Sequence, residues 1–246
     1  MNTIEYPFHS SFRSSDSLEF KVICPFSSTK DQKITLNLRL IMSPSTISLL
    51  DAIKGRSSLH TLSDDVDIPD SRVQEIVREG ILHSPTPFNC QSGRAVVLVK
   101  AEHKKFWDLA HDSAKSKVPA AVFEKVFAPR IKMFRAAYGT ILFYESGNAM
   151  QAVCERMPIV KDKMPQWTEH ASGMLQYTIW TMLTAEGFGV SLQHYNPMVD
   201  AAAAKEWDIP ADWSLNAQMV FGKPTGPRFA EKEYSPVEER MKVYGA

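Results

Sequence analysis

Four groups of polar side chains stand at the boundaries of the helices and strands that the sequence predicts, where ligand sites commonly lie. They are Arg56-Ser57-Ser58, Asn89-Cys90-Gln91-Ser92, Gln193-His194-Tyr195 and Lys232. Motifs for other chemistry are absent from the sequence, which has no G-x-G-x-x-G after a strand, no Walker loop, no H-E-x-x-H and no G-x-S-x-G. The residue types therefore indicate ligand binding rather than a catalytic triad or a pair of catalytic carboxylates.

Composition narrows the class of protein that could carry such a site. The chain has 246 residues, of which 44% are hydrophobic and 23% charged, and this favours one folded globular domain. Its 28 Lys and Arg equal its 28 Asp and Glu, so no net charge attracts nucleic acid. Apolar stretches such as Ala95–Val99 are far shorter than the roughly 20 residues that span a bilayer. We expect neither a nucleic-acid nor a membrane partner.

The three cysteines, Cys24, Cys90 and Cys154, are odd in number and form no C-x-x-C pair. This pattern indicates free thiols in a reducing compartment, and we expect a cytoplasmic protein, with a nuclear location as the alternative. No basic residue adjoins Cys90 in the sequence to activate its thiol, so we expect Cys90 to be inert.

The first 41 residues differ from the rest because they are rich in Ser and show no amphipathic period. We expect residues 1–41 to be a disordered or non-native extension, and residues 42–246 to form the folded domain. A mitochondrial presequence would be poor in acidic residues, whereas this stretch contains Glu5, Asp16, Glu19 and Asp31. We therefore do not expect it to direct the chain to mitochondria.

Periodic apolar positions predict two helices at the start of the domain. Ser45 or Thr46 caps the first helix, which ends at Gly55. The second helix begins after Pro69-Asp70 and ends at the Pro-rich stretch 84–87. Their predicted apolar faces consist of Ile47, Leu50 and Ile53 in the first helix and of Val73, Ile76, Val77 and Ile81 in the second.

Strands and helices alternate over the remaining sequence. Strands are predicted over Ala95–Val99, Thr140–Tyr144, Gly187–Leu192 and Leu215–Phe221. Helices are predicted over Ala101–Lys115, Ala120–Ala137, Trp167–Ala185 and Met198–Trp207, with Gly139 breaking the chain after the second of them. The helix that starts at Trp167 is apolar over most of its circumference and is expected to be the central buried helix. The resulting fold class is α+β, with helices flanking a mixed central sheet.

Three stretches of the chain resemble signature segments of the nitroreductase-like flavoproteins. They are KGRSSLHTL at 54–62, HSPTPFNCQSGR at 83–94 and GFGVSLQHYNP at 187–197. Shorter stretches at 173–176, 191–197 and 236–240 are similar to the subgroup of fungal fatty-acid-repression-mutant proteins and bacterial copper-induced nitroreductases. The resemblance runs in order from about residue 48 to 245 and leaves residues 1–41 outside it.

The resemblance implies that FMN binds at the interface of an obligate homodimer. The residues that hold the ribityl phosphate in the family are matched by Arg56, Ser58 and Lys232, and Ser57 lies between the first two. Guanidinium, hydroxyl and ammonium donors suit a phosphate. Asn89 and Gln91 match the amides that bond the flavin ring and ribityl chain. Gln193 and His194 match residues near the reactive nitrogen of the ring.

Two positions depart from the family pattern. Many relatives carry two adjacent Arg residues where this chain has Arg56-Ser57. Tyr234 stands where other nitroreductases place a further phosphate-binding Arg, so the resemblance leaves Lys232 to act alone at that end of the site.

Each assignment has a structural alternative that the residues alone leave open. Arg56 follows a helix C-terminus, where a cation also complements the helix dipole. Asn89 and Gln91 lie in a Pro-rich loop, where amide side chains commonly bond their own backbone. A single histidine after a strand, such as His194, is commonly structural, so we treat it only as a neighbour of the cofactor.

The activity implied by the resemblance is FMN-dependent reduction of nitroaromatics, quinones or similar electrophiles. NADH or NADPH would deliver hydride to flavin N5 and leave, after which a small-molecule electrophile would collect the electrons in a ping-pong cycle. The resemblance also links the chain to the oxidative stress response. The alternative is a flavin-binding regulatory protein in stress or lipid signalling, whose turnover is incidental.

Overall fold

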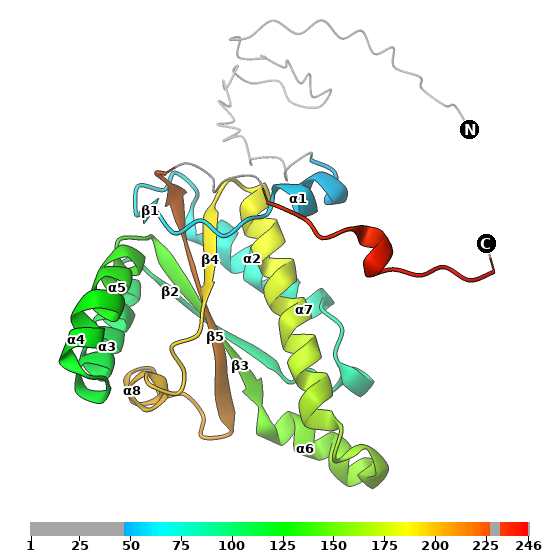
Figure 1. Cartoon of the computed structure of the whole chain (residues 1–246). Helices are drawn as coiled ribbons and strands as arrows, with labels where there is room; N and C mark the ends of the chain where they lie inside the picture. The colour runs from blue at the N-terminus through cyan, green and yellow to red at the C-terminus, as the bar shows by residue number, and fades with distance from the viewer. Residues whose placement is uncertain (1–46, 227–231, 246) are drawn as a thin grey trace, which may run out of the picture. The chain divides into compact units, whose positions relative to one another are not determined.

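The computed structural model describes residues 47–226 and 232–245. Within the first of these segments, a five-stranded sheet lies between two layers of helices (Figure 1). This arrangement confirms the predicted α+β fold class. No helix in the described part of the chain is long and apolar enough to cross a membrane.

The sheet is organised around its longest strand, β5. The strands are β1 (Leu62–Ser63), β2 (Gly93–Val99), β3 (Gly139–Ser146), β4 (Gly189–Gln193) and β5 (Trp213–Pro224). β5 pairs with β3 on one side and with β4 and β1 on the other, and β2 forms the edge beyond β3. All of these pairs are antiparallel, so the parallel component expected of a mixed sheet is limited to one bridge between Ser58 and Val190.

Gly139 was predicted to break the chain, but it is the first residue of β3. A Cβ atom on Gly139 would lie 2.3 Å from the ring of Phe221 on the neighbouring strand. The glycine therefore permits a close approach between the strand and an aromatic side chain. Gly187 has a φ of 94° and lies outside β4, so that strand begins two residues later than predicted.

The first helix, α1 (Leu49–Gly55), begins later than predicted and is oriented differently. Ser48 is its N-cap, because its hydroxyl accepts a hydrogen bond from the amide of Asp51. Ser45 and Thr46, the predicted caps, lie outside the described residues. The predicted apolar face is exposed, with Leu50 at 57% and Ile53 at 37%, because α1 turns Ala52 toward the protein instead.

The second helix, α2 (Asp70–His83), confirms the prediction at both ends. Val73, Ile76 and Val77 are buried as predicted, but Ile81 is 41% exposed. The reason is the neighbouring Gly80, which packs so closely on Ile179 that a Cβ atom there would lie 2.4 Å from the isoleucine side chain. Because Gly80 faces this contact, Ile81 points away from it.

Ile179 belongs to α7 (Met164–Ala185), the longest helix of the described chain (Figure 1). Its buried positions pack with α2 and the sheet in an apolar cluster that contains Leu175, Ile179 and Leu183. The opposite side is not covered, because Met174 is 43% and Tyr177 is 42% exposed. The helix expected to be the central buried helix is therefore buried, within a single chain, only on the side that faces α2 and the sheet.

The other face of the sheet is covered by α3 (Lys100–Lys117), α5 (Ala128–Arg135) and α8 (Asp200–Glu206). The predicted helix over Ala120–Ala137 is divided into α4 (Ala120–Val122), a π-helical turn at Phe123–Phe127 and α5. Pro129 explains the wider turn, because proline lacks an amide hydrogen and its ring clashes with the carbonyl four residues earlier.

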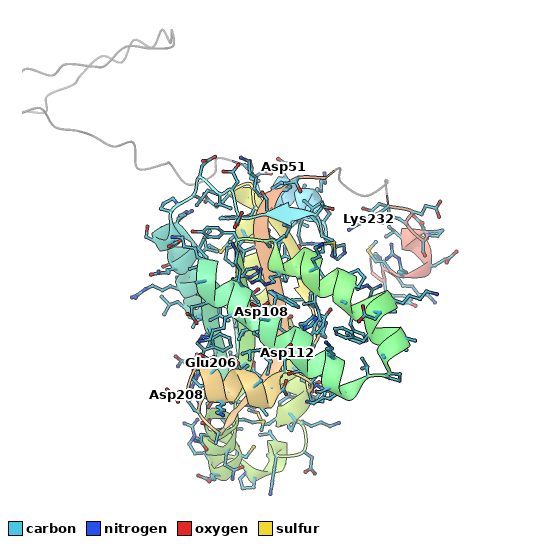
Figure 2. All side chains as sticks on the ribbon, turned by 90° about the vertical axis from the view of Figure 1, so that its left-hand side faces the viewer. Asp51, Asp108, Asp112, Glu206, Asp208 and Lys232 are labelled. Atoms are coloured by element: carbon cyan, nitrogen blue, oxygen red, sulfur yellow. The ribbon has the colours of Figure 1, made fainter. Side chains whose placement is uncertain are left out.

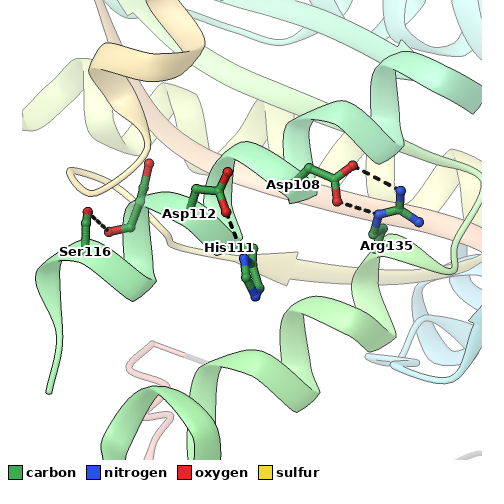
Figure 3. A network of polar contacts seen from close by, with 6 residues as sticks. Asp108, His111, Asp112, Ser116 and Arg135 are labelled. Atoms are coloured by element: carbon green, nitrogen blue, oxygen red, sulfur yellow. Dashed lines mark hydrogen bonds and ion pairs between the residues drawn. The ribbon is translucent and has the colours of Figure 1, made fainter. Parts of the chain in front are cut away.

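The outer surface of α3 carries charged side chains, one of which joins it to α5 by an ion pair. Figure 2 shows Asp108 and Asp112 on this surface, with Glu206 and Asp208 close by. Asp108 accepts two hydrogen bonds from Arg135 of α5, at 2.7 and 3.0 Å (Figure 3). The pair is exposed and contributes at most about 1 kcal/mol to stability.

Sequence analysis did not predict α6 (Gly147–Arg156), which is capped by the Ser146 hydroxyl. The 3₁₀ turns at Pro87–Asn89, Pro158–Val160 and Val237–Glu239 complete the described elements. Cys90 and Cys154 are free thiols, as expected, and Cys24 lies outside the described residues.

A buried histidine connects α3 to β3. The Nδ1 atom of His103 lies 2.8 Å from the Thr140 hydroxyl, which also accepts a hydrogen bond from the Trp107 indole at 3.0 Å. His103 is fully buried, and burial lowers its pKa from 6.5 to about 4.

We predict that His103 makes the folded state sensitive to acid. The unfolded chain protonates this histidine below pH 6.5 and the folded chain only near pH 4, so stability is complete above pH 6.5 and falls by about 3 kcal/mol as the pH drops to 4. Denaturant unfolding of a His103→Gln variant should show a flatter pH profile over this range than the parent. His83→Gln, at an exposed site, should keep the parent slope. Equal slopes for all three proteins would contradict the prediction.

Candidate functional site

The predicted phosphate ligands lie on the segment that leaves α1 and runs beside β4. The Ser58–Val190 bridge and a 2.9 Å hydrogen bond from the Leu59 amide to the Val190 carbonyl hold this segment. The Arg56 guanidinium lies over the Trp180 ring of α7, 4.6 Å from its centroid. Arg56 is therefore placed by a cation–π contact rather than only by the helix dipole.

The end of β4 lies beside this segment. Gln193 follows Val190 by three residues, which corresponds to about 10 Å along a strand. Gln193 donates a 2.6 Å hydrogen bond to the buried Ser191 hydroxyl, whose oxygen also lies 2.8 Å from His60 Nδ1. Ser58 and His60 thus lie beside β4, and Gln193 is the last residue of that strand; we call Arg56, Ser57, Ser58, Gln193 and His194 the first ligand group.

A second arginine, Arg130, lies near His60 of the same segment. Burial lowers the pKa of His60, and the nearby Arg130 guanidinium lowers it further. Tyr195, next to the exposed His194, is buried among aromatic rings, and its burial raises the pKa to about 12. A guanidinium such as that of Arg56 suits an anionic ligand, because its planar donors match phosphate and carboxylate oxygens.

The remaining predicted ring ligands, Asn89 and Gln91, form a second ligand group. They lie in the loop between α2 and β2, where both side chains are exposed. The loop is held through the backbone of Gln91: its backbone amide donates to the Thr86 hydroxyl at 3.0 Å, and its backbone carbonyl accepts from the Arg94 guanidinium at 2.6 Å.

The two ligand groups lie at opposite ends of α7. Arg56 contacts Trp180 near the C-terminal end, whereas Phe88 of the second group's loop contacts Trp167 near the N-terminal end, with ring centroids 6.0 Å apart. The two tryptophans are 13 residues apart, which corresponds to about 20 Å along the helix axis. One chain therefore does not bring Arg56 and the loop of Asn89 and Gln91 to one place.

Lys232 belongs to the second described segment, 232–245, and its side chain is exposed. Residues 227–231 separate it from the sheet and lie outside the described residues. Its part in a phosphate site remains a prediction.

A cavity of about 760 Å³ lies elsewhere, where α2 and α3 begin. Two ion pairs occupy its wall, between Lys100 and Asp70 at 2.6 Å and between Lys104 and Asp64 at 2.9 Å. None of the predicted ligands lines it. Across the described residues, no cluster of three His, Cys, Asp or Glu side chains could hold a metal ion.

Sequence analysis missed His60, Ser191 and Trp180 as members of the site. Alternation supplied a usable signal for His60, because Arg56, Ser58 and His60 occupy every second position of an extended segment and therefore share a face. Trp180 carried no such signal, since nothing in the sequence places one face of a distant helix against Arg56.

Comparison with known proteins identifies the family of the chain. Residues 53–223 match the family model of the Nitroreductase family. Two proteins of Saccharomyces cerevisiae named as nitroreductases, HBN1 and FRM2, are 31% and 33% identical to the chain. Each match covers 75% of this chain, together with 92% of HBN1 and 91% of FRM2. Nitroreductase CinD from Lactococcus lactis, solved with chloramphenicol, is 34% identical with a TM-score of 0.73, over 80% of this chain and all of that one.

The matched segment includes both ligand groups and every strand except the last residue of β5. The chain belongs to the nitroreductase family, and its general activity is that of a nitroreductase-type oxidoreductase. The resemblance to the fungal and bacterial subgroup is likewise confirmed.

Proposed function

We propose that the chain is an FMN-dependent oxidoreductase that takes electrons from NADH or NADPH and reduces nitroaromatics, quinones or similar electrophiles. The observation that carries the proposal is the first ligand group, in which Ser58 is bridged to Val190 of β4 and Arg56 lies over the Trp180 ring. A flavin phosphate needs charged and hydroxyl donors, and the ring needs polar contacts nearby.

Unused hydrogen-bonding capacity supports the fit of FMN to this site. The Ser57 hydroxyl and the Trp180 indole nitrogen, on either side of Arg56, are buried without a partner among the described residues. Buried polar groups are normally satisfied, and those left over in a native protein commonly mark a binding site. Arg56, Ser57 and Ser58 would hold the phosphate, and Lys232 would add a further charge.

When bound, FMN supplies the hydride-accepting and hydride-donating chemistry. The protein's own residues bind and orient the group: Gln193 and His194 would contact the ring, and Asn89 and Gln91 would bond its polar edge and the ribityl chain. No acid–base residue is assigned. The two substrates would use one open face in turn, which is the ping-pong order.

Ligands of similar proteins favour this substrate assignment. CinD was solved with chloramphenicol and with 4-nitrophenol, which are both nitroaromatic compounds. It was also solved with nicotinic acid, which shares its pyridine ring with nicotinamide. A protein of the same fold from Desulfovibrio desulfuricans, 18% identical with a TM-score of 0.59, was solved with FMN.

We further propose that the working unit is a homodimer, located in the cytoplasm and linked to the oxidative stress response. If both ligand groups contact one flavin, they must come from different chains, because about 20 Å of α7 separates them within one chain. A two-fold axis that pairs α7 antiparallel with its copy would place the second ligand group of one chain beside the first group of the other.

Exposed apolar side chains lie on the surface that this pairing would cover. α1 packs on α7 and exposes Leu49 at 75% and Leu50 at 57%, while α7 exposes Met174 and Tyr177. Clustered apolar exposure of this kind commonly marks a protein interface. A partner chain would also account for the uncovered side of α7, which was expected to be buried.

The phosphate assignment predicts a loss of FMN affinity in an Arg56→Ala variant. Removing one charged hydrogen-bond donor should cost about 1.5–3 kcal/mol of binding free energy, or roughly 10- to 150-fold in Kd. Fluorescence titration of the flavin-free protein with FMN would measure this. Arg78→Ala, which removes an exposed arginine from α2, should bind as the parent does. Unchanged affinity in Arg56→Ala would remove Arg56 from the site.

The proposed activity predicts that anaerobic NADH or NADPH bleaches the yellow absorbance of the FMN-loaded protein. Addition of 4-nitrophenol or a quinone should then restore the colour, because the acceptor takes the electrons. Stopped-flow absorbance would give both rates. If neither nicotinamide bleaches the protein while dithionite does, the chain binds flavin without this activity.

The dimer proposal predicts that Met174→Asp separates the two chains and releases flavin in the same step. A buried carboxylate at an obligate interface, which commonly covers more than about 2,000 Å², should shift sedimentation to the monomer. Val122→Asp, at an equally exposed apolar residue on α4, should remain dimeric. A monomer that keeps FMN at parent affinity would show that each chain forms a complete site.

A further inference from the structure

The loop of the second ligand group has an unusual backbone. Phe88, Asn89 and Gln91 all have left-handed φ angles, of 52°, 53° and 48°, although none of them is glycine. Such conformations are uncommon for residues with a side chain and cost free energy, so they persist only where surrounding contacts fix them. The contacts that fix this loop therefore determine how Asn89 and Gln91 are presented.

Hydrogen bonds on the outer side of the loop come from its own backbone and from Thr86. The amide of Asn89 donates to the Thr86 carbonyl at 3.1 Å, and the amide of Cys90 donates to the Pro87 carbonyl at 3.0 Å. The Gln91 amide donates to the Thr86 hydroxyl. These bonds are local, and most of them are partly exposed, so by themselves they leave the loop free to open.

The inner side is held by a buried chain of polar groups. Ser92 is fully buried; its hydroxyl accepts from the Cys90 thiol, with sulfur and oxygen 3.4 Å apart, and as a hydrogen-bond donor it lowers the pKa of the neighbouring Glu145 carboxyl. Glu145 faces Gly93 across the β2–β3 pair, and one of its oxygens lies 3.9 Å from the Cβ position of that glycine. The loop is thereby connected to β3, in the interior of the sheet.

Burial of the Glu145 carboxyl at this position costs free energy of folding. Only 9% of it is exposed, and its Oε2 atom is buried without a partner among the described residues. Burial raises the pKa of the carboxyl, although the Ser92 hydrogen bond and the Arg94 charge oppose this. A carboxyl group in apolar surroundings opposes folding unless its contacts compensate, so stability alone does not account for it.

We propose that Glu145 is a positioning residue of the cofactor site, which acts through Ser92 to hold the strained loop so that Asn89 and Gln91 face outward toward the flavin. The proposal rests on the proposed function for the identity of the ligand, but the holding of the loop is a property of the chain itself. Glu145 contacts neither flavin nor substrate in this account.

Two substitutions at Glu145 and one control separate positioning from general stability. Glu145→Gln keeps an oxygen that accepts from the Ser92 hydroxyl, whereas Glu145→Leu keeps the volume and removes the acceptor. Thr140→Val removes a buried hydroxyl from the same strand, where it bonds His103 and Trp107 on the other face of the sheet. For each full-length protein, amide hydrogen exchange at 89–91, FMN affinity and melting temperature would be measured.

We expect Glu145→Leu to speed exchange at the three loop amides about tenfold and to raise the Kd for FMN about tenfold, because one hydrogen bond no longer fixes the loop. Glu145→Gln should restore both values to within about threefold of the parent. Thr140→Val should lower the melting temperature without changing either value.

Two results would overturn the proposal: loop exchange in Glu145→Leu equal to that in Thr140→Val, or faster exchange with unchanged FMN affinity. A parent protein that binds no FMN would instead refute the proposed function. The exchange rates would still show whether Glu145 holds the loop.

Discussion

The close packing of α7 against α2 and the sheet is the constraint on which the site depends. Gly80 allows Ile179 to approach α2 so closely that no larger residue would fit without displacement. Once α7 is fixed there, Trp180 supports Arg56 at one end and Trp167 meets Phe88 at the other. Because a helix is stiff along its axis, the separation of the two ligand groups is set by the number of residues between the two tryptophans.

This separation changes the meaning of the predicted ligand set. Eight residues matched the family pattern as though they formed one site, and the segments that carry them are short and well spaced in the sequence. Within the described chain, Arg56 and the loop of Asn89 and Gln91 lie at opposite ends of α7, so the proposed flavin site would need a second copy. The α7 side that would meet this copy also bears the apolar residues that the fold leaves exposed.

The periodic pattern of apolar residues predicted those helices and strands well whose apolar residues face the core. The strands β2, β3 and β5 and the helix α2 were found near their predicted bounds because their apolar residues face a single core. Errors arose where a particular neighbour determined the outcome. Gly139 starts a strand because Phe221 crosses it, and Ile81 is exposed because Gly80 takes the contact with α7. Such pairs are distant in sequence, and no local pattern reveals them.

The site was predictable as a set of residue types but not as an arrangement. The signature segments identified Arg56, Asn89 and Gln193 because their chemistry suits a phosphate and a polar ring. The side chains that hold these residues in place could not be predicted from the sequence in the same way. Glu145 lies at the end of a strand whose sequence resembles any buried strand, and only the pairing of β3 with β2 places it under the loop.

The edge position of β2 affects how readily the unfolded chain can aggregate. Its sequence, Gly-Arg-Ala-Val-Val-Leu-Val, is apolar and β-branched, and among the described strands it pairs only with β3. A segment of this composition with one unpaired backbone edge is a template for strand addition by other chains. Helices α2 and α3 pack against β2 in the folded chain. A chain in which these helices have not yet docked would therefore be more prone to aggregate through β2 than the folded protein.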